Sequence, residues 1–334
     1  MSSLYLGIDT SNYRTSVAAV NDGGKPVFHK AVLLDVDQGE RGLRQSDAFF
    51  RHSNRLPEYL RELLSHIDIA SVAAVGVSER PRRVEGSYMP CFMAGVNAAG
   101  ILGSTLGVPV YGYSHQEGHA ASILESDGAL PPERSLLFHL SGGTTEALLC
   151  SPDDNGYCME IAGGTLDISI GQLLDRYGVA MGMPFPSGQY LDDIAYSVLE
   201  NTGFDQETAA ETGVMPKIRI KDGYFNLSGA ETRLMKYAGS HSNDKEAAQV
   251  AAELFVSIAK LLTDEAAYLS DKYGIKDIYM AGGAASSRTV RKLLSAVKGM
   301  DIKFGDAALS GDNAVGTALL AKRVHETGNS NSGK

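Results

Sequence analysis

With 334 residues, the chain is too long for one small hydrophobic core, so its length predicts about two domains. A content of 43% hydrophobic and 21% charged residues is that of an ordinary globular protein, and no apolar run approaches the roughly 20 residues that span a bilayer. Three cysteines without a CxxC pair argue against a disulfide scaffold or a thiolate zinc site, and a formal charge of -10 disfavours nonspecific binding of nucleic acid.

The first half of the chain alternates strand patterns with helical ones. Two strands are predicted at 4–11 and 15–21, joined by a turn at Asn12 and Tyr13. The next predicted elements are an amphipathic helix at 54–67, a buried strand at 72–78, a small-residue helix at 89–107, a strand at 108–114 and a helix beginning near His115. No signal-peptide pattern precedes the first strand, so we expect a cytoplasmic protein without a membrane partner.

The second half of the chain repeats this opening. A strand, a glycine turn and a strand are predicted over 135–150, then a helical segment at about 165–265, a strand at 277–283 and a helix from Asp312 to about His325. Two such openings indicate a duplicated fold with mixed α/β layers. We expect an N-terminal lobe (1–112 and about 313–326), a C-terminal lobe (113–312) and a disordered polar tail (327–334).

Small-residue turns follow three of the predicted strands, at 7–11, 141–145 and 281–285. Because small side chains let a phosphate approach the backbone N–H groups closely, such turns suit nucleotide binding. One such turn is weak evidence, whereas two that open hairpins and one that opens a helix are specific. The arrangement resembles the actin, heat-shock protein and sugar-kinase superfamily, which implies a duplicated actin-like ATPase fold with two lobes and a central cleft.

Two histidines, His115 and His119, lie four residues apart, so on a helix their rings project from one face and can share an ion. Taken alone, two histidines at this spacing are more often a coincidence than a metal site. An oxygen ligand from a distant turn would complete a set of two histidines and a carboxylate, which suits iron or zinc. Glu117 lies on the opposite helix face, unlike the glutamate of zinc peptidases, so a peptidase is rejected.

Over about residues 4–322, the sequence resembles the family of tRNA threonylcarbamoyladenosine synthase catalytic subunits, once labelled sialoglycoprotein endopeptidases. The matching segments include the H-x-E-G-H pattern at 115–119, the turn at 141–143, the segment at 225–232 and the turn at 311–314. The resemblance implies an acyltransferase that moves threonylcarbamoyl from its adenylate to an adenine of tRNA. It also implies one divalent metal, iron or zinc, held by His115, His119 and Asp312; the alternative for Asp312 is a helix N-cap.

ATP or an adenylate is the second cofactor that the resemblance implies. The residues that it places at the nucleotide are Ser11, His139, Leu140, Ser141, Gly142, Gly143, Asp175, Gly188, Gly283 and Ser287. Asp175 would accept hydrogen bonds from the ribose, its alternative being a surface helix charge. The implied partners are an adenine nucleotide, tRNA bound with the help of other subunits, and a protein bound through the N-terminal lobe. No catalytic residue is assigned.

Several positions depart from the family's pattern around the expected phosphate and transfer chemistry. They are Tyr13 and Arg14 for two acids, Thr144 for histidine, Ile168 for the second aspartate of T-x-D-D, Gln172 for glutamate, Arg176 for lysine, Ser287 for asparagine, and 80–82 for G-P-G. Two functions therefore stay open: the acyltransferase, and a catalytically degenerate nucleotide-binding regulatory or assembly subunit. A sugar kinase is a weaker third, because no catalytic base can be named.

Two short basic segments stand out against the acidic composition. They contain Arg80, Arg82 and Arg83, and Lys217, Arg219 and Lys221. Each is either a local phosphate-binding patch or a solvated loop.

Overall fold

The computed structural model of the protein describes residues 2–11, 14–35, 43–204, 212–240, 244–306 and 314–331. The chain forms two compact units: one of Met1–Glu133, Ser151–Met159 and Ala308–Lys334, the other of Arg134–Cys150 and Glu160–Ala307. This division differs from the predicted lobes at helix α3 (His115–Leu124), which belongs to the first unit because it packs on helix α9 (Val315–Asn331). No helix in the described ranges is long and apolar enough to cross a bilayer.

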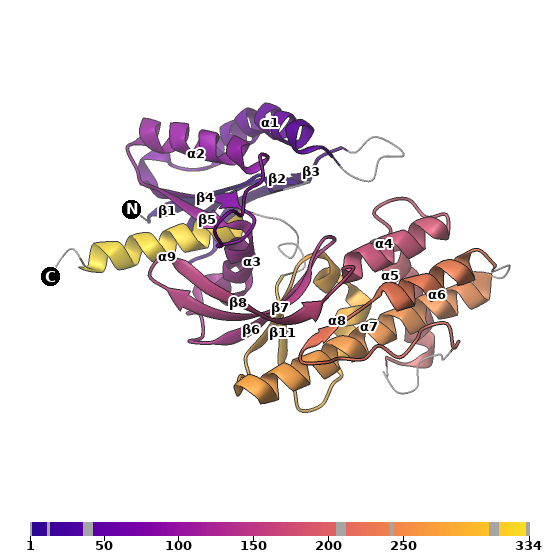
Figure 1. The fold of residues 1–334 in the computed structure, drawn as a ribbon. Helices are drawn as coiled ribbons and strands as arrows, with labels where there is room; N and C mark the ends of the chain where they lie inside the picture. Colours follow the sequence, from indigo (N-terminus) through magenta and orange to yellow (C-terminus); the bar gives the residue numbers. More distant parts are fainter. Residues whose placement is uncertain are drawn as a thin grey trace. The chain divides into compact units, whose positions relative to one another are not determined.

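A five-stranded sheet in the order β3-β2-β1-β4-β5 forms the centre of the first unit (Figure 1). Strands β1, β2 and β3 are antiparallel neighbours, whereas β4 and β5 continue the sheet parallel to β1. The strands are β1 (Leu4–Asp9), β2 (Arg14–Asn21), β3 (Pro26–Leu33), β4 (Val72–Arg80) and β5 (Val110–Ser114). The predicted first hairpin is confirmed, and its turn residues Asn12 and Tyr13 lie outside the described residues. Strand β3 was not predicted, because this edge strand buries too little to show an alternating pattern.

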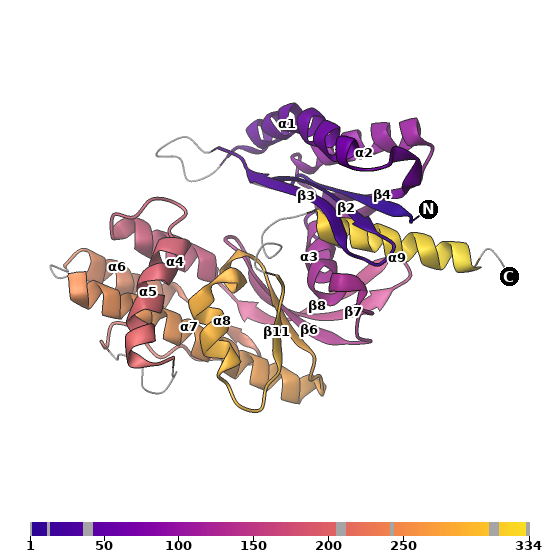
Figure 2. The ribbon, with the colours of Figure 1, turned by 180° about the vertical axis from the view of Figure 1, so that it is seen from behind.

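Helices cover both faces of this sheet. Helices α1 (Gln45–His66) and α2 (Phe92–Leu106) lie on one face, and α3 and α9 lie on the other (Figures 1 and 2). The core under α1 and α2 contains Ile8, Val17, Leu56 and Val75. The apolar side chains on both faces of the sheet are thus removed from water, which is the main driving force for this layering.

Glycines in β1 and β4 bring α9 close to the sheet. A Cβ on Gly7 would lie 2.0 Å from the carbonyl oxygen of Ala314, and one on Gly76 would lie 2.1 Å from that of Thr317. Gly7 was expected to serve a phosphate turn, but it lies within β1 and serves helix packing instead. Helix α9 continues to Asn331, so the prediction of a disordered tail is wrong for residues 327–331. Tyr5 donates a hydrogen bond to Glu326 (3.1 Å), which holds this end of α9 against β1.

The second unit contains a six-stranded sheet in the order β11-β10-β6-β7-β8-β9. Its strands are β6 (Ser135–Leu140), β7 (Thr145–Asp153), β8 (Gly156–Thr165), β9 (Tyr224–Phe225), β10 (Ile278–Ala281) and β11 (Ile302–Phe304). Strand β6 pairs antiparallel with β7 and parallel with β10, as β1 does with β2 and β4. The order β8-β7-β6-β10-β11 therefore repeats β3-β2-β1-β4-β5, and the predicted duplication is confirmed.

The described part of the second unit contains five helices, of which α7 is the longest. They are α4 (Ile170–Ala180), α5 (Gly188–Thr202), α6 (Ser228–Ala238), α7 (Asp244–Tyr273) and α8 (Arg288–Ser295). Helix α7 contacts both α5 and α8, and its buried side chains, such as Phe255 and Leu262, join those of β6 in one core. The segment predicted as helical at about 165–265 is interrupted by β9 and by the extended stretch before it. In this stretch Ile218 and Ile220 pack against the core.

Helix α7 also buries a carboxyl group in this core. Glu265 is fully buried, and neither of its carboxyl oxygens has a hydrogen-bond partner among the described residues. It lies against β8, where a Cβ on Gly163 would be 2.9 Å from its Oε1. Burial in these apolar surroundings raises the pKa of Glu265 from its ordinary 4.5 to about 8. The side chain is therefore neutral in the folded protein at pH 7.

Glu265→Gln should make the stability of the protein less sensitive to pH between about 4.5 and 8. The unfolded wild type releases this proton above about pH 4.5, whereas the folded protein keeps it until about pH 8, so wild-type stability falls across this window. The stability of the variant relative to wild type should rise by on the order of 1 kcal/mol for each pH unit in the window. Urea unfolding at pH 5 to 8 measures this. Asp264→Asn, an exposed change on the same helix, should follow the wild type; a pH-independent difference for Glu265→Gln would contradict the prediction.

Candidate functional site

Helix α3 carries the two histidines in its first two turns. It begins directly after β5 with a capping box, in which Ser114 accepts a hydrogen bond from the Glu117 N–H and its own N–H donates to the Glu117 carboxylate (2.8 Å). The rings of His115 and His119 project from one side, and their Nε2 atoms are 3.0 Å apart. Two unprotonated nitrogens at this distance repel each other unless a proton or a cation lies between them.

The tautomer of His115 follows from its other ring nitrogen. Nδ1 of His115 lies 2.8 Å from Oδ2 of Asp9, which is buried at the end of β1. Because an ionised carboxylate only accepts hydrogen bonds, Nδ1 carries the proton and Nε2 keeps its lone pair. The 3.0 Å spacing of the two Nε2 atoms is that of an N–H···N hydrogen bond, and it also brings both nitrogens close enough to contact one ion.

The predicted third ligand, Asp312, lies outside the described residues. Within the described ranges, no three His, Cys, Asp or Glu side chains form a group that could hold a metal ion. Just after the gap, the Ala314 N–H donates to Oγ of Ser16 (2.9 Å). Helix α9 then crosses α3 in backbone contact, since a Cβ on Gly316 would lie 1.8 Å from the Gly118 carbonyl oxygen. The start of α9 is thereby held next to the histidine helix, and the role of Asp312 stays a prediction.

Glu117 is engaged on the other side of α3. Besides capping the helix, its buried carboxylate accepts a hydrogen bond from the Tyr157 N–H (3.1 Å) and lies 3.5 Å from Nη1 of Arg83. Arg83 also pairs with Asp153 (2.7 Å). Glu117 is therefore a structural cap, and Arg83, one of the candidate phosphate-binding cations, is instead part of an internal ion-pair network.

In the second unit, the predicted phosphate turn follows β6. The Ser141 N–H donates to the Thr144 carbonyl (2.8 Å), and the Thr144 N–H donates to Oγ of Ser141 (3.0 Å). The N–H groups of Gly142 and Gly143 have no acceptor among the described residues, and a Cβ on either glycine would meet no atom within 4 Å. This turn therefore presents two accessible amides of the kind that bind an anion.

The third predicted turn lies beside this one, because β10 and β6 are parallel neighbours in which Ala281 pairs with His139. Gly282 has a φ of 97°, and its Cβ would lie 2.4 Å from the Leu140 carbonyl oxygen, so only glycine fits there. Gly283 follows in an exposed turn with open space at its Cβ position. Ligands commonly bind where parallel strands end at one sheet edge.

Asp175, in the middle of α4, holds the start of α5. Its Oδ1 accepts hydrogen bonds from the N–H groups of Ser187 (2.8 Å) and Gly188 (3.2 Å), where α5 begins. No partner of Oδ2 lies among the described residues. Burial raises the pKa of Asp175 above its ordinary value, and the two backbone donors offset only part of this rise. At the N-terminus of α4, Ser169 donates to the Gly142 carbonyl (2.7 Å), which ties this helix to the phosphate turn.

The remaining predicted nucleotide residues are engaged within their own units. Leu140 is part of the hydrophobic core, and His139 is buried in β6. The Ser287 hydroxyl caps α8 and donates to Asp192 (2.6 Å). In the first unit, both the N–H and the hydroxyl of Ser11 donate to the Asp9 carboxylate. Any contact of the Ser11 or Ser287 hydroxyl with a nucleotide would compete with these internal hydrogen bonds.

Asp167, the retained aspartate of the T-x-D-D stretch, is a helix cap that sequence reasoning missed. It accepts hydrogen bonds from the N–H groups of Leu227 (2.8 Å) and Ser228 (3.0 Å) at the start of α6. Its burial raises its pKa, but these donors outweigh burial and hold the pKa well below its usual range. Ile168, which replaces the second aspartate, packs against the core.

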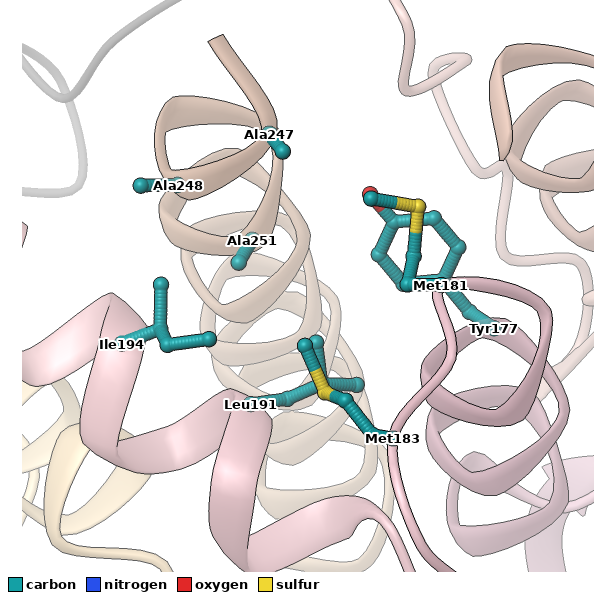
Figure 3. Close-up of a pocket in the computed structure, with 8 residues that line it drawn as sticks. All are labelled: Tyr177, Met181, Met183, Leu191, Ile194, Ala247, Ala248 and Ala251. Atoms are coloured by element: carbon teal, nitrogen blue, oxygen red, sulfur yellow. The ribbon is translucent and has the colours of Figure 1, made fainter. Parts of the chain in front are cut away.

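An apolar pocket lies elsewhere in the second unit, among α4, α5 and the first turns of α7 (Figure 3). Its lining residues are Tyr177, Met181, Met183, Leu191, Ile194, Ala247, Ala248 and Ala251. None of them is a predicted nucleotide residue. The hydroxyl of Tyr177 is the one polar side-chain group of this lining, so the pocket lacks the donors that a phosphate needs.

Gly316→Ala should destabilise the first unit, because its methyl group would lie 1.8 Å from the backbone oxygen of Gly118, which cannot move aside like a flexible side chain. We expect the free energy of unfolding to fall by about 1–3 kcal/mol or more. The control is Gly100→Ala on the exposed side of α2, where no atom lies within 4 Å, and it should gain up to about 1 kcal/mol. Urea unfolding measures both, and unchanged stability of Gly316→Ala would refute the close crossing of α3 and α9.

Two solved structures have the same fold. HypF from T. kodakarensis superposes with a TM-score of 0.62 at 12% identity, over 98% of this chain and 48% of that chain. Component A of (R)-2-hydroxyglutaryl-CoA dehydratase from Acidaminococcus fermentans gives a TM-score of 0.54 at 16% identity, over 97% of this chain and 100% of that chain. These are proteins of the actin-like ATPase fold, so the predicted fold class is confirmed.

The sequence comparisons identify the family. A family model described as tRNA N6-adenosine threonylcarbamoyltransferase matches residues 38–319. The protein of that description from Thermotoga neapolitana is 28% identical over 325 residues, which cover 96% of this chain and 93% of the relative. The one from Bacillus subtilis is 25% identical over 337 residues, covering 97% and 91%. The chain therefore belongs to the tRNA N6-adenosine threonylcarbamoyltransferase family, as the motifs in its sequence predicted.

Proposed function

We propose that this protein transfers a threonylcarbamoyl group from its adenylate to the amine of an adenine in tRNA. In this reaction the amine attacks the carbamoyl carbon, the bond from that carbon to the phosphate oxygen breaks, AMP leaves and the amine loses a proton. The observation that carries the proposal is the 3.0 Å approach of the His115 and His119 Nε2 atoms, in a chain that belongs to this transferase family.

One divalent metal, iron or zinc, would be held by His115, His119 and Asp312. When bound, it would act as a Lewis acid and template for the acyl adenylate. The spacing of the two ring nitrogens and the lone pair on His115 Nε2 fit this role. A set of two histidines and a carboxylate suits either iron or zinc.

The second unit supplies the groups for an adenine nucleotide. The accessible amides of Gly142 and Gly143 would neutralise phosphate charge, and Oδ2 of Asp175 would accept a hydrogen bond from the ribose. Gly283, in the neighbouring turn, leaves room for the adenosine. All of these groups are held by strand ends and helix starts, so they orient the adenylate without reorganising.

For the tRNA, we propose that phosphates bind an exposed basic segment before β9. Lys217, Arg219 and Lys221 are exposed, whereas Ile218 and Ile220 between them pack against the core. The three cations therefore share one face of an extended segment, with successive ones about 6.6 Å apart. Cations in such a row can contact successive phosphates of a nucleic-acid strand.

Replacing these three cations by alanine should weaken tRNA binding and flatten its dependence on salt. The slope of log K against log salt concentration should fall by about 2–3, because each lost phosphate contact removes about 0.7–0.9. Filter binding or fluorescence anisotropy over a salt series measures this. The matched control replaces Lys260, Lys276 and Lys298, which are exposed in the same unit, and changes the net charge equally. An equal loss of slope in both variants would mean that only overall charge matters.

A second candidate function is a nucleotide-binding regulatory or assembly subunit that no longer transfers. Specific observations favour it: Ser287, at the family's asparagine position, caps α8, and Ile168, at the family's second aspartate, packs against the core. The first hairpin has Arg14 where the family has an acid. Such a subunit would bind its ligands and pair with an active partner through the N-terminal lobe.

Cells depleted of their own synthase separate the two candidates, with threonylcarbamoyladenosine in tRNA measured by mass spectrometry. We expect this protein to restore measurable but subnormal modification, because the departures disturb positioning while the histidine pair is retained. The His115→Ala, His119→Ala double variant should restore none, whereas His66→Ala, an exposed change on α1, should match wild type.

Normal modification by the wild type would show that the departures are without effect. No modification, from a purified protein that still contains metal and an adenine nucleotide by elemental analysis and mass spectrometry, would favour the regulatory subunit.

A further inference from the structure

We propose that Asp9 is a positioning residue for the metal site, through its hydrogen bond to the ring of His115. This inference rests on the proposed metal site of the preceding subsection. Asp9 is the last residue of β1 and only 1% exposed, and its Oδ2 lies 2.8 Å from Nδ1 of His115. Position 9 belongs to the hairpin that the sequence assigned to phosphate, so this role was not predicted.

The carboxylate of Asp9 is held in one orientation by three different elements. Its Oδ1 accepts hydrogen bonds from the N–H (2.8 Å) and the hydroxyl (2.5 Å) of Ser11, in the turn after β1. Its Oδ2 accepts from the Ser78 hydroxyl in β4 (2.6 Å) and from His115 in α3. A carboxylate with donors on both oxygens cannot rotate without breaking several charge-assisted hydrogen bonds. It therefore presents Oδ2 to the imidazole in a fixed direction.

This fixed direction decides what His115 can bind. With its proton on Nδ1, the ring directs the Nε2 lone pair toward Nε2 of His119. Without Asp9, the ring could take the other tautomer, with the proton on Nε2, which cannot bind an ion, or another rotamer. Carboxylates behind metal-binding histidines commonly act in this way, by fixing the tautomer and raising the basicity of the ligand.

The same strand pair also holds the backbone at the start of α9. In the register of β1 and β2, Asp9 lies opposite Ser16. The hydroxyl of Ser16 accepts a hydrogen bond from the Ala314 N–H (2.9 Å), two residues after the predicted ligand Asp312. One cross-strand pair therefore anchors both the histidine ring and the backbone at Ala314, directly before α9.

The test compares Asp9→Asn with the wild-type protein as full chains. Affinities for Fe²⁺ and Zn²⁺ are measured by chelator competition, and the tautomer of His115 in the metal-free protein is measured by long-range ¹H–¹⁵N NMR. We expect the wild type to hold the Nδ1–H tautomer, and Asp9→Asn to bind metal about 10–100-fold more weakly. The matched control is Thr15→Val, which removes a similar buried contact, from Thr15 Oγ1 to His52 Nδ1 (2.8 Å), and should leave metal affinity within about twofold.

The outcomes separate this inference from the proposed function. Wild type that binds neither ion would overturn the metal site itself and this inference with it. If the wild type binds metal and Asp9→Asn binds it equally well, the role of Asp9 alone is overturned. The same holds if Thr15→Val loses as much metal affinity as Asp9→Asn. An Nε2–H tautomer in the metal-free wild type would also overturn it, and this measurement does not depend on whether the variant folds.

Discussion

The backbone contact between α3 and α9 is the constraint on which the organisation of the first unit depends. Gly118 and Gly316 meet there without side chains, because a Cβ on Gly316 would lie 1.8 Å from the Gly118 carbonyl oxygen. Gly7 and Gly76 let the other side of α9 approach the sheet in the same manner. Close packing of this kind leaves α9 no freedom to slide, so the residues at its start keep a fixed relation to the histidines of α3.

Buried acids show how the surroundings decide the use of one functional group. Asp9, Glu117 and Asp167 all accept several hydrogen bonds from backbone or side-chain donors, which hold each carboxylate in place. Glu265 has no such donor among the described residues, and it is kept neutral instead. The first three acids act as fixed joints between elements, whereas the fourth makes stability depend on pH.

The two halves of the duplicated fold use equivalent turns differently. In the first unit, the amide and hydroxyl of Ser11 in the turn after β1 are taken up by Asp9, so this hairpin supports the histidine helix. In the second unit, the turn after β6 has no such acid, and the amides of Gly142 and Gly143 stay accessible. Whether an acid accepts the hydrogen bonds of the turn thus decides whether the turn is structural or can bind an anion.

Local patterns in the sequence were sufficient for the duplicated α/β fold, for the main helices and hairpins, and for the one-sided histidine pair, because periodicity and turn composition depend on neighbouring residues. The family followed from the same short motifs. The sequence did not reveal that Asp9 contacts His115, that Ser287 donates to Asp192, that Asp167 caps α6, or that Arg83 belongs to an internal ion-pair network. Each of these depends on residues far apart in the chain, and such pairings leave no periodic trace in the sequence. Only the packing of the strands and helices brings them within hydrogen-bonding distance, and that tertiary arrangement decided their roles.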